Sequence, residues 1–324
     1  LRGVDLLGQS AASPAALVVE QCSGTVWVED CVVGPQSNGV GSRDGARVTD
    51  AAAVVFERCL LRGSGYVFLA DLPGAGGEGL RVDTASVAVH DSDALGSNGS
   101  PYFPLTGEGP FPGGAGMSVE DGVLFVSGGT AQGGSGGHGG FDFVFGFCIG
   151  PNGGGPGVHV RNPSSVFRHV GGTFTGGTGG VAFVALCPGE DAPDGLPIQN
   201  GGGLVVALPG APHALSIPSP LRGGETLLAT LGGEPGELAV LALSLGAAPL
   251  YTPGLGEVLV AQPPLLFTAG LVDASGVATK SFAVPVLGPP FEALALVWQG
   301  AFLDPQGGVA TGAGSVVTVL DPAL

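Results

Sequence analysis

A short strand pattern that recurs along the first two-thirds of the chain constrains this protein more than any other feature of its sequence. Six segments share the pattern, and their central residues are Val19, Val48, Val82, Val119, Val160 and Val206. Successive central valines lie 29, 34, 37, 41 and 46 residues apart, so the loops lengthen while the strand unit is kept. Self-similarity at a period of roughly 20 to 50 residues is typical of stacked repeat folds.

Further short apolar strands complete each repeat. A second strand follows each of the first five segments, at 26–28, 54–56, 87–89, 124–126 and 165–167, and a third is predicted at 66–69, 143–145 and 182–185. Helical periodicity is essentially absent, which removes leucine-rich and βαβ alternatives. Three short strands per repeat describe one coil of a triangular β-helix, in which coils stack about 4.8 Å apart and like residues form ladders.

This repeat pattern resembles the pectin-lyase-like family of right-handed parallel β-helices. The resemblance implies a parallel β-helix of about six coils over residues 1–212, and it implies nothing about activity. The chain opens at Leu1-Arg2-Gly3 in mid-pattern, without an initiator Met or a signal peptide. We therefore expect a mature or truncated product of a longer precursor, with the β-helix cut at its N-terminal end.

The character of the chain changes near residue 213. Longer alternating strands follow, separated by Gly- and Pro-rich turns, at 214–218, 225–231, 237–245, 257–261, 265–273, 279–285, 293–298 and 314–320. This spacing predicts a small, antiparallel, Ig-like β-sandwich over 213–324. Residues 295–304 and 316–320 resemble a C-terminal module of secreted proteins from planctomycete-type bacteria, and that resemblance implies export and a non-catalytic role. The fold class predicted for the whole chain is all-β.

The composition of the chain limits the kinds of partner that it is expected to bind. The chain has 10 basic and 27 acidic residues, a net charge of −17, and 44% hydrophobic residues. Such a charge disfavours nucleic acid and anionic bilayers, and no apolar run approaches the roughly 20 residues that span a membrane. The 63 glycines punctuate valine-rich stretches, which indicates a folded chain with many tight turns.

The cysteines suggest stacked pairs. Cys148 and Cys187 occupy the same point of adjacent coils, where the spacing suits a disulfide. Cys31 and Cys59 also occupy equivalent positions, and they either bond or stack as small buried apolar residues. Cys22 is then the odd thiol. No CxxC spacing is present, so no zinc site is expected.

Candidate chemistry is sparse. Gly137-His138-Gly139 matches one of the four signatures of β-helix galacturonases, and the other three are missing. A polar ladder is expected where strands end, either capping the backbone or forming a functional acidic stripe; its members are Gln21, Asp50, Thr84, Asp121 and Asn162. The arginines that a lyase would need are scattered, at Arg58, Arg81, Arg161 and Arg168. An outward Asp83–Glu120–Arg161 ladder is expected, stabilising neighbouring coils.

Two acidic segments, 90–93 and 190–194, are either calcium sites or solvated loops. No residue is assigned a catalytic, cofactor-binding or metal-binding role, and no cofactor is expected.

These patterns favour an extracellular or cell-surface structural protein of a bacterium, without catalytic activity and self-assembling head-to-tail into a filament. Its expected partners are further copies of itself or cell-surface components. The alternative is a protein that binds or degrades carbohydrate, with a neutral glycan as ligand. In that alternative, loop aromatics form a sugar platform unless they fold inward over the coils: Tyr102, Phe103, Phe111, Phe141, Phe143 and Phe147.

Overall fold

The structure is a computed structural model, and it describes residues 1–8, 14–35, 43–65, 75–102, 109–142, 146–182, 189–252, 256–288 and 291–323. Within these ranges the chain is all-β, as the sequence predicts, and it contains no helix. It divides into two compact units, Leu1–Ala207 and Leu208–Leu324. None of the described residues forms a helix long and apolar enough to cross a membrane.

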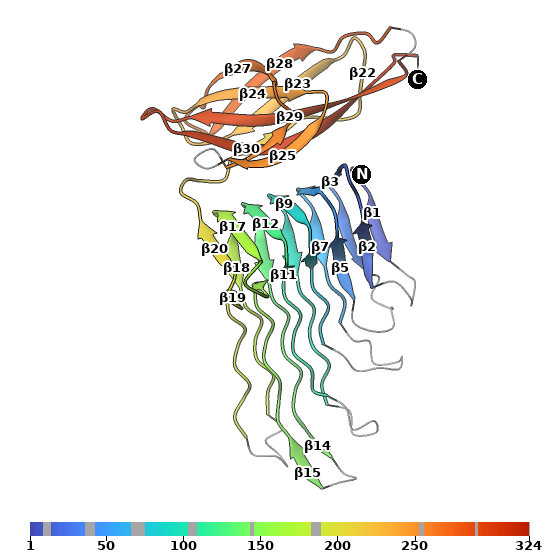
Figure 1. The fold of residues 1–324 in the computed structure, drawn as a ribbon, viewed down its shortest axis with the longest axis vertical. Helices are drawn as coiled ribbons and strands as arrows, with labels where there is room; N and C mark the ends of the chain where they lie inside the picture. The colour runs from blue at the N-terminus through green and yellow to red at the C-terminus, as the bar shows by residue number, and fades with distance from the viewer. Residues whose placement is uncertain are drawn as a thin grey trace. The chain divides into compact units, whose positions relative to one another are not determined.

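The N-terminal unit is built from three parallel sheets of six strands each (Figure 1). Sheet 1 consists of β2 (Ala15–Glu20), β5 (Asp44–Thr49), β8 (Leu80–Asp83), β11 (Met117–Glu120), β16 (Val158–Val160) and β19 (Ile198–Asn200). Sheet 2 consists of β3 (Thr25–Glu29), β6 (Ala53–Glu57), β9 (Ser86–His90), β12 (Val123–Ser127), β17 (Val166–Val170) and β20 (Leu204–Ala207). Sheet 3 consists of β1 (Asp5–Gly8), β4 (Val32–Pro35), β7 (Leu60–Arg62), β10 (Asp93–Leu95), β13 (Thr130–Gln132) and β18 (Thr173–Thr175).

The chain visits the three sheets in a constant order, and each circuit adds one strand to each sheet. The predicted valine ladder is confirmed: Val19 pairs in register with Val48, and the ladder continues through Val82 and Val119 to Val160. These side chains lie in one buried cluster with larger residues such as Phe56 and Phe167. Parallel strands wound in this way are consistent with a parallel β-helix.

The sixth repeat was assigned to the wrong sheet. Val206 lies in β20 and pairs with Arg168 in sheet 2. The strand of sheet 1 in this coil is β19, where Asn200 occupies the valine position opposite Val160. The sheet 1 strand of this coil has no apolar residue at the valine position, because the coil is the last of the stack and packs against only one neighbouring coil.

The third strands also differ from the prediction. Residues 66–69, 143–145 and 183–185 of the predicted strands lie outside the described residues. The strands of sheet 3 instead follow sheet 2 after two corner residues, and several are only three residues long. Their brevity leaves too little alternation for a sequence pattern to register.

Each coil turns sharply at two corners, and at most of these corners a residue takes the left-handed conformation; the corner at Asn162 has none. Gln21, Asp50, Thr84 and Asp121 have φ values of 52°, 49°, 53° and 52° at the corner between sheets 1 and 2. Their N–H groups bond to the next coil, as when Asp50 N donates to Asp83 O at 3.1 Å. The polar ladder is thus a row of corner residues, and Asp and Asn tolerate this conformation better than most residue types.

Of the two alternatives for Cys31 and Cys59, the structure shows the stacked one: they are not disulfide-bonded, and both are free thiols in the core. The Cys31 Sγ donates to Glu29 O at 3.1 Å, and the Cys59 Sγ lies 3.3 Å from both Val28 O and Glu57 O. In-register side chains of parallel strands point the same way about 4.8 Å apart, whereas a disulfide needs Cβ atoms about 3.8 Å apart. The other predicted pair includes Cys187, which lies outside the described residues, so it stays a prediction.

The C-terminal unit is mainly antiparallel. One sheet holds β21 (Ala214–Ser216), β23 (Thr226–Gly232) and β28 (Val277–Ala283), and a hairpin is formed by β25 (Ala247–Thr252) and β26 (Gly256–Val260). A five-stranded sheet holds β22 (Leu221–Arg222), β30 (Val309–Leu320), β29 (Ala293–Leu303), β24 (Leu238–Ser244) and β27 (Leu265–Leu271), with β22 parallel to β30. Side chains from both larger sheets, including Leu231 and Phe302, form one buried cluster.

Candidate interaction surface

Long extended segments project from the coils beyond the strands (Figure 1). We call 96–102, 133–139 and 176–182 the outgoing arms, because each continues directly from a strand of sheet 3. The return arms, 109–116, 150–157 and 189–197, lead back to strands of sheet 1. Together the two sets form what we call the glycine layers.

Hydrogen bonds hold the glycine layers together with a period of three residues. Within the outgoing layer, Gly133 N donates to Thr175 O at 2.9 Å and Gly136 N donates to Thr178 O at 2.8 Å. Between the layers, Gly155 N donates to Gly134 O at 2.8 Å. A three-residue repeat is the period of a polyproline II helix, which has no internal hydrogen bonds and leaves its backbone groups available to neighbours.

Glycine is required where the two layers meet. A Cβ atom on Gly113 would lie 1.9 Å from Gly134 O, and one on Gly154 would lie 2.0 Å from Gly177 O. Neighbouring backbones therefore come closer than any side chain allows. The sequence interpretation of these glycines as turn residues was incomplete, because here they form the contact between layers.

Every third residue of an outgoing arm points away from the opposite layer. With the outward residues of β10, β13 and β18, these positions form what we call the polar face: Asp93, Leu95, Asn98, Pro101, Thr130, Gln132, Ser135, His138, Thr173, Thr175, Thr178 and Val181. Its members are linked across coils. The Thr130 hydroxyl donates to Asp93 Oδ1 at 2.7 Å, and the Thr178 hydroxyl donates to Ser135 Oγ at 2.8 Å.

The structure explains His138 without catalysis. Its Nδ1 accepts a hydrogen bond from Val181 N at 2.9 Å, and its carbonyl accepts one from Tyr102 N at 3.1 Å. The ring is exposed, and the glycines on either side belong to the three-residue repeat. The resemblance to a galacturonase signature therefore follows from the arm pattern.

The acidic segment 190–194 caps the edge of the outgoing layer. Asp194 Oδ1 accepts from Gly179 N at 2.7 Å, and Asp191 Oδ1 accepts from Ala182 N at 2.9 Å. These N–H groups occupy the positions from which the preceding arm bonds to its neighbour. Carboxylates that occupy such an edge discourage another chain from adding to it.

The side chains of the other acidic segment, 90–93, do not point toward a common centre. His90 is buried, the Ser92 hydroxyl donates to His90 O at 2.8 Å, and Asp93 belongs to the polar face. Burial lowers the pKa of His90 to about 4. Among the described residues, no three His, Cys, Asp or Glu side chains are placed to hold a metal ion.

The far end of the layers is closed by a short hairpin, β14 (Gly140–Asp142) with β15 (Phe147–Ile149). Tyr102 is buried there, and its hydroxyl donates to Asp142. Burial and this bond raise the pKa of Tyr102 to about 12.

The aromatic residues that were predicted to form a sugar platform differ in how deeply they are buried. Tyr102 is buried, Phe111 and Phe141 are half-buried, and Phe147 is 50% exposed. Phe103 and Phe143 lie outside the described residues. The described aromatics therefore do not share a single flat surface.

A charge network crosses the outer side of sheet 1. Glu120 is in register with Asp83, as predicted, and accepts from Arg81 at 3.4 Å. Arg161 lies 4.0 Å from Glu120, but its closer partner is Glu78, which also accepts from the Ser118 hydroxyl. Sequence reasoning missed Glu78 because it precedes its strand and pairs two coils away.

Asp44 lies beside this network and accepts from Glu78 N at 2.9 Å. Burial and the neighbouring Glu78 carboxylate raise the pKa of Asp44 to about 6.

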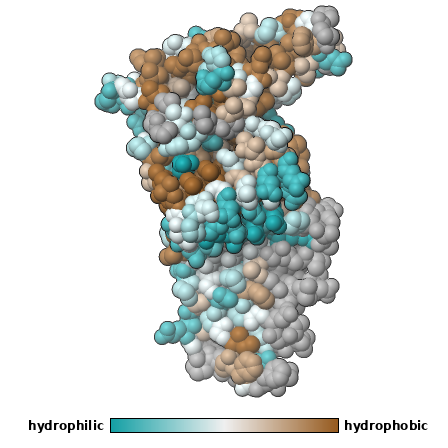
Figure 2. Space-filling view, in the orientation of Figure 1, coloured by the Kyte–Doolittle hydropathy of each residue, from teal (hydrophilic) through white to brown (hydrophobic). Residues whose placement is uncertain are grey.

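In the orientation of Figure 2, hydrophilic colour gathers over the strand-bearing part of the N-terminal unit.

Arg58 lies at the corner between sheets 2 and 3 and binds several carboxylates there. Its guanidinium bonds to Asp30 at 2.7 Å, to Glu29 at 2.5 Å and to Glu57. Burial holds the pKa of Glu57 well above its usual range, although Arg58 acts in the opposite direction. The role of this arginine is to join neighbouring coils.

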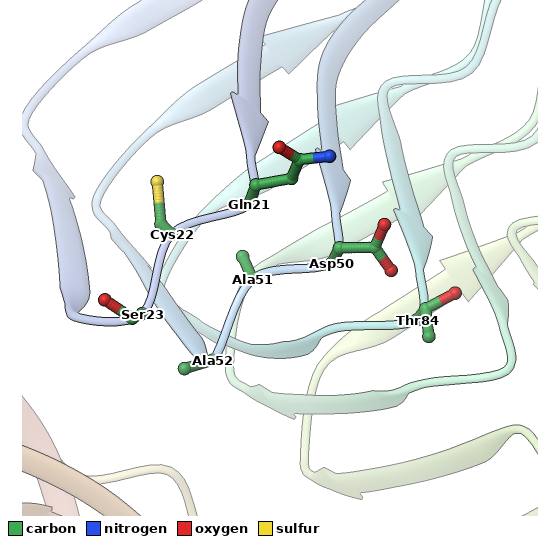
Figure 3. A pocket seen from close by; sticks show the side chains of 7 residues that line it. All are labelled: Gln21, Cys22, Ser23, Asp50, Ala51, Ala52 and Thr84. Carbon is green, nitrogen blue, oxygen red and sulfur yellow. The ribbon is translucent and has the colours of Figure 1, made fainter.

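A shallow groove of about 530 Å³ lies at the first corner of the early coils, lined by Gln21, Cys22, Ser23, Asp50, Ala51, Ala52 and Thr84. Figure 3 shows Gln21, Asp50 and Thr84 extending to one side as successive members of the corner ladder, while Cys22 points elsewhere. This groove brings together no pair of groups suited to acid–base catalysis.

These observations define a class: an all-β protein with a stack of parallel coils, extended by glycine layers. No protein-family model matches the chain, and no curated protein matches it. Among solved structures, a superoxide reductase (neelaredoxin) from Ignicoccus hospitalis aligns over 33% of this chain and 80% of its own, at 10% identity and a TM-score of 0.20. A TM-score that low carries no argument about fold or function.

Proposed function

We propose that this protein is a non-catalytic, extracellular structural or surface protein of a bacterium, assembling head-to-tail into a filament. The finer features of the fold belong to this proposal. They are a right-handed winding, an Ig-like sandwich in the C-terminal unit, a secretion module at its end and a Cys148–Cys187 disulfide.

One observation carries the structural role. The polar residues that could serve chemistry are used to hold coils or layers together. Arg58 bonds to carboxylates of two coils, Arg161 bridges to Glu78, and Asp194 caps a backbone N–H group. His138 accepts from Val181 N in the neighbouring arm.

Head-to-tail assembly is supported by the strand order. In the described chain, β18, β19 and β20 are edge strands at one end of the three sheets, and the carboxylates of 190–194 cap only the arm that continues from β18. Parallel strands from a second copy can extend all three sheets at once, and such a heterologous contact does not close on itself.

Electron microscopy and sedimentation of the purified chain over a concentration series test assembly. We expect filaments that lengthen with concentration. Ala207→Pro in β20 places a ring at the edge that added strands must approach, because Leu204 N donates inward to Ser165 O and the N–H of Ala207, by alternation, faces outward; it should shorten the filaments. Dispersed monomers at high concentration would remove the assembly part of the proposal, and turnover of a polysaccharide would remove the non-catalytic part.

A further inference from the structure

We infer that the polar face is a binding surface for an extended, neutral polysaccharide. This inference goes beyond the structural role proposed above and does not depend on assembly. It rests on the exposure, charge and hydrogen-bonding capacity of the polar face.

The polar face is nearly free of charge in a chain whose net charge is −17. Setting His138 aside, Asp93 is its one formally charged member, and the exposed Arg62 of β7 borders it beside Leu95. The Asp93 carboxylate already accepts the Thr130 hydroxyl at 2.7 Å. The remaining members are mainly hydroxyls and amides, which both donate and accept hydrogen bonds. This chemistry matches sugar hydroxyls, whereas the charge of the chain disfavours anionic polymers.

Several polar side chains have unused hydrogen-bonding capacity. Gln132, Thr173 and Thr175 are exposed, and their side chains make no hydrogen bond within the described residues. Gln132 and Thr175 are neighbours in register, as are Thr130 and Thr173. The face therefore offers adjacent donors and acceptors that the fold itself does not use.

The spacing suits a long ligand. Outward positions recur every second residue along the strands, about 6.6 Å, and every third residue along the arms, about 9 Å. From Thr173 to Val181 this amounts to about 25 Å of one continuous arm.

The backbone beneath the face is already ordered. Gly134 and Gly177 are bonded to the opposite layer, where Gly134 N donates to Gly114 O and Gly177 N donates to Gly155 O, both at 2.8 Å. A rigid surface of this kind loses little conformational entropy when it binds. Weak single contacts can then add up along the ligand.

Retention on insoluble cellulose, chitin and curdlan tests the inference, with heparin and polygalacturonate as anionic comparisons. We expect the full chain to be retained on at least one neutral polymer. The double variant Gln132→Glu/Thr175→Glu, which adds two carboxylates to the centre of the face, should lower retention at least tenfold. Thr226→Glu/Thr279→Glu is the matched control, because it adds the same two carboxylates at exposed threonines of β23 and β28 in the C-terminal unit, outside the polar face.

Circular dichroism and melting temperature establish that the variants are folded. Thr173→Arg provides a second test with the opposite charge and a large side chain, and it should weaken retention as well. The inference is overturned if no neutral polymer retains the wild type, if only anionic polymers do, or if folded face variants bind as tightly as the control.

Discussion

Replacing Asp44 with asparagine should stabilise the protein at neutral pH and leave its stability unchanged in acid. Asp44 is partly buried beside Glu78, and its pKa is raised from 3.8 to about 6. The folded state therefore holds a proton on Asp44 at pH values where the unfolded state has released it. Stability is lost as the pH rises from about 4 through 6, and the cost stays at its full value above that range.

The size of this cost follows from the change in pKa. One pKa unit corresponds to about 1.4 kcal/mol, so the rise to about 6 sets an upper limit of about 3 kcal/mol. An asparagine side chain at this position would keep an oxygen that accepts the Glu78 N–H bond and would carry no charge. We expect Asp44→Asn to gain about 1–3 kcal/mol at pH 8, or roughly 3–8 °C in melting temperature.

Differential scanning calorimetry of the full chain at pH 4, 6 and 8 measures this gain. Asp83→Asn is the matched control, since Asp83 lies on the same sheet in register with Glu120, and it should show little gain. An Asp44→Asn variant that is equally stabilised at pH 4 and pH 8, or destabilised at pH 8, would refute the linkage argument.

Two further substitutions probe the glycine layers, and one labelling experiment probes the core. Gly134→Ala should cost at least about 2 kcal/mol, because the added Cβ would lie 1.9 Å from Ser97 O; chemical denaturation measures it. Asp194→Ala should cost about 1–2 kcal/mol and increase self-association, because it leaves Gly179 N uncapped at an edge; light scattering follows the association. Cys59 should resist a thiol reagent until the chain is denatured, because it is buried and burial raises its pKa to about 12.

Each of these has its own control. Ser135→Ala, on the outward side of the same arm, should be nearly neutral, and an equal loss would argue against close packing of the layers. Glu190→Ala should leave association unchanged. Rapid labelling of Cys59 in the native protein would contradict its place in the core, whereas labelling of the half-buried Cys22 would not.

The ladder of central valines could be predicted, because in-register parallel strands place equivalent residues of successive coils above one another. The same reasoning correctly paired Glu120 with Asp83. It failed for Val206, where the terminal coil has no apolar requirement at the valine position of sheet 1. It left open whether Cys31 and Cys59 bond or stack, since equivalent positions alone do not decide whether two side chains converge.

The candidate surface was harder to predict than the coils. Sequence reasoning interpreted the glycines of the arms as turn residues. A polyproline II arm has no internal hydrogen bond, so its period becomes visible only when neighbouring arms are in place. For the same reason the acidic segment 190–194 could not be recognised as an edge cap.

The sequence by itself determined the all-β class, the stacking of the coils and the ladder positions, because alternation and repeat length are local properties of a strand. Only the tertiary structure decided that Arg161 pairs with Glu78, that Asp191 and Asp194 cap an edge, and that the glycines join two layers. These contacts join residues from different coils and arms. Their partners depend on how far each loop travels before it returns, and no local pattern records that distance.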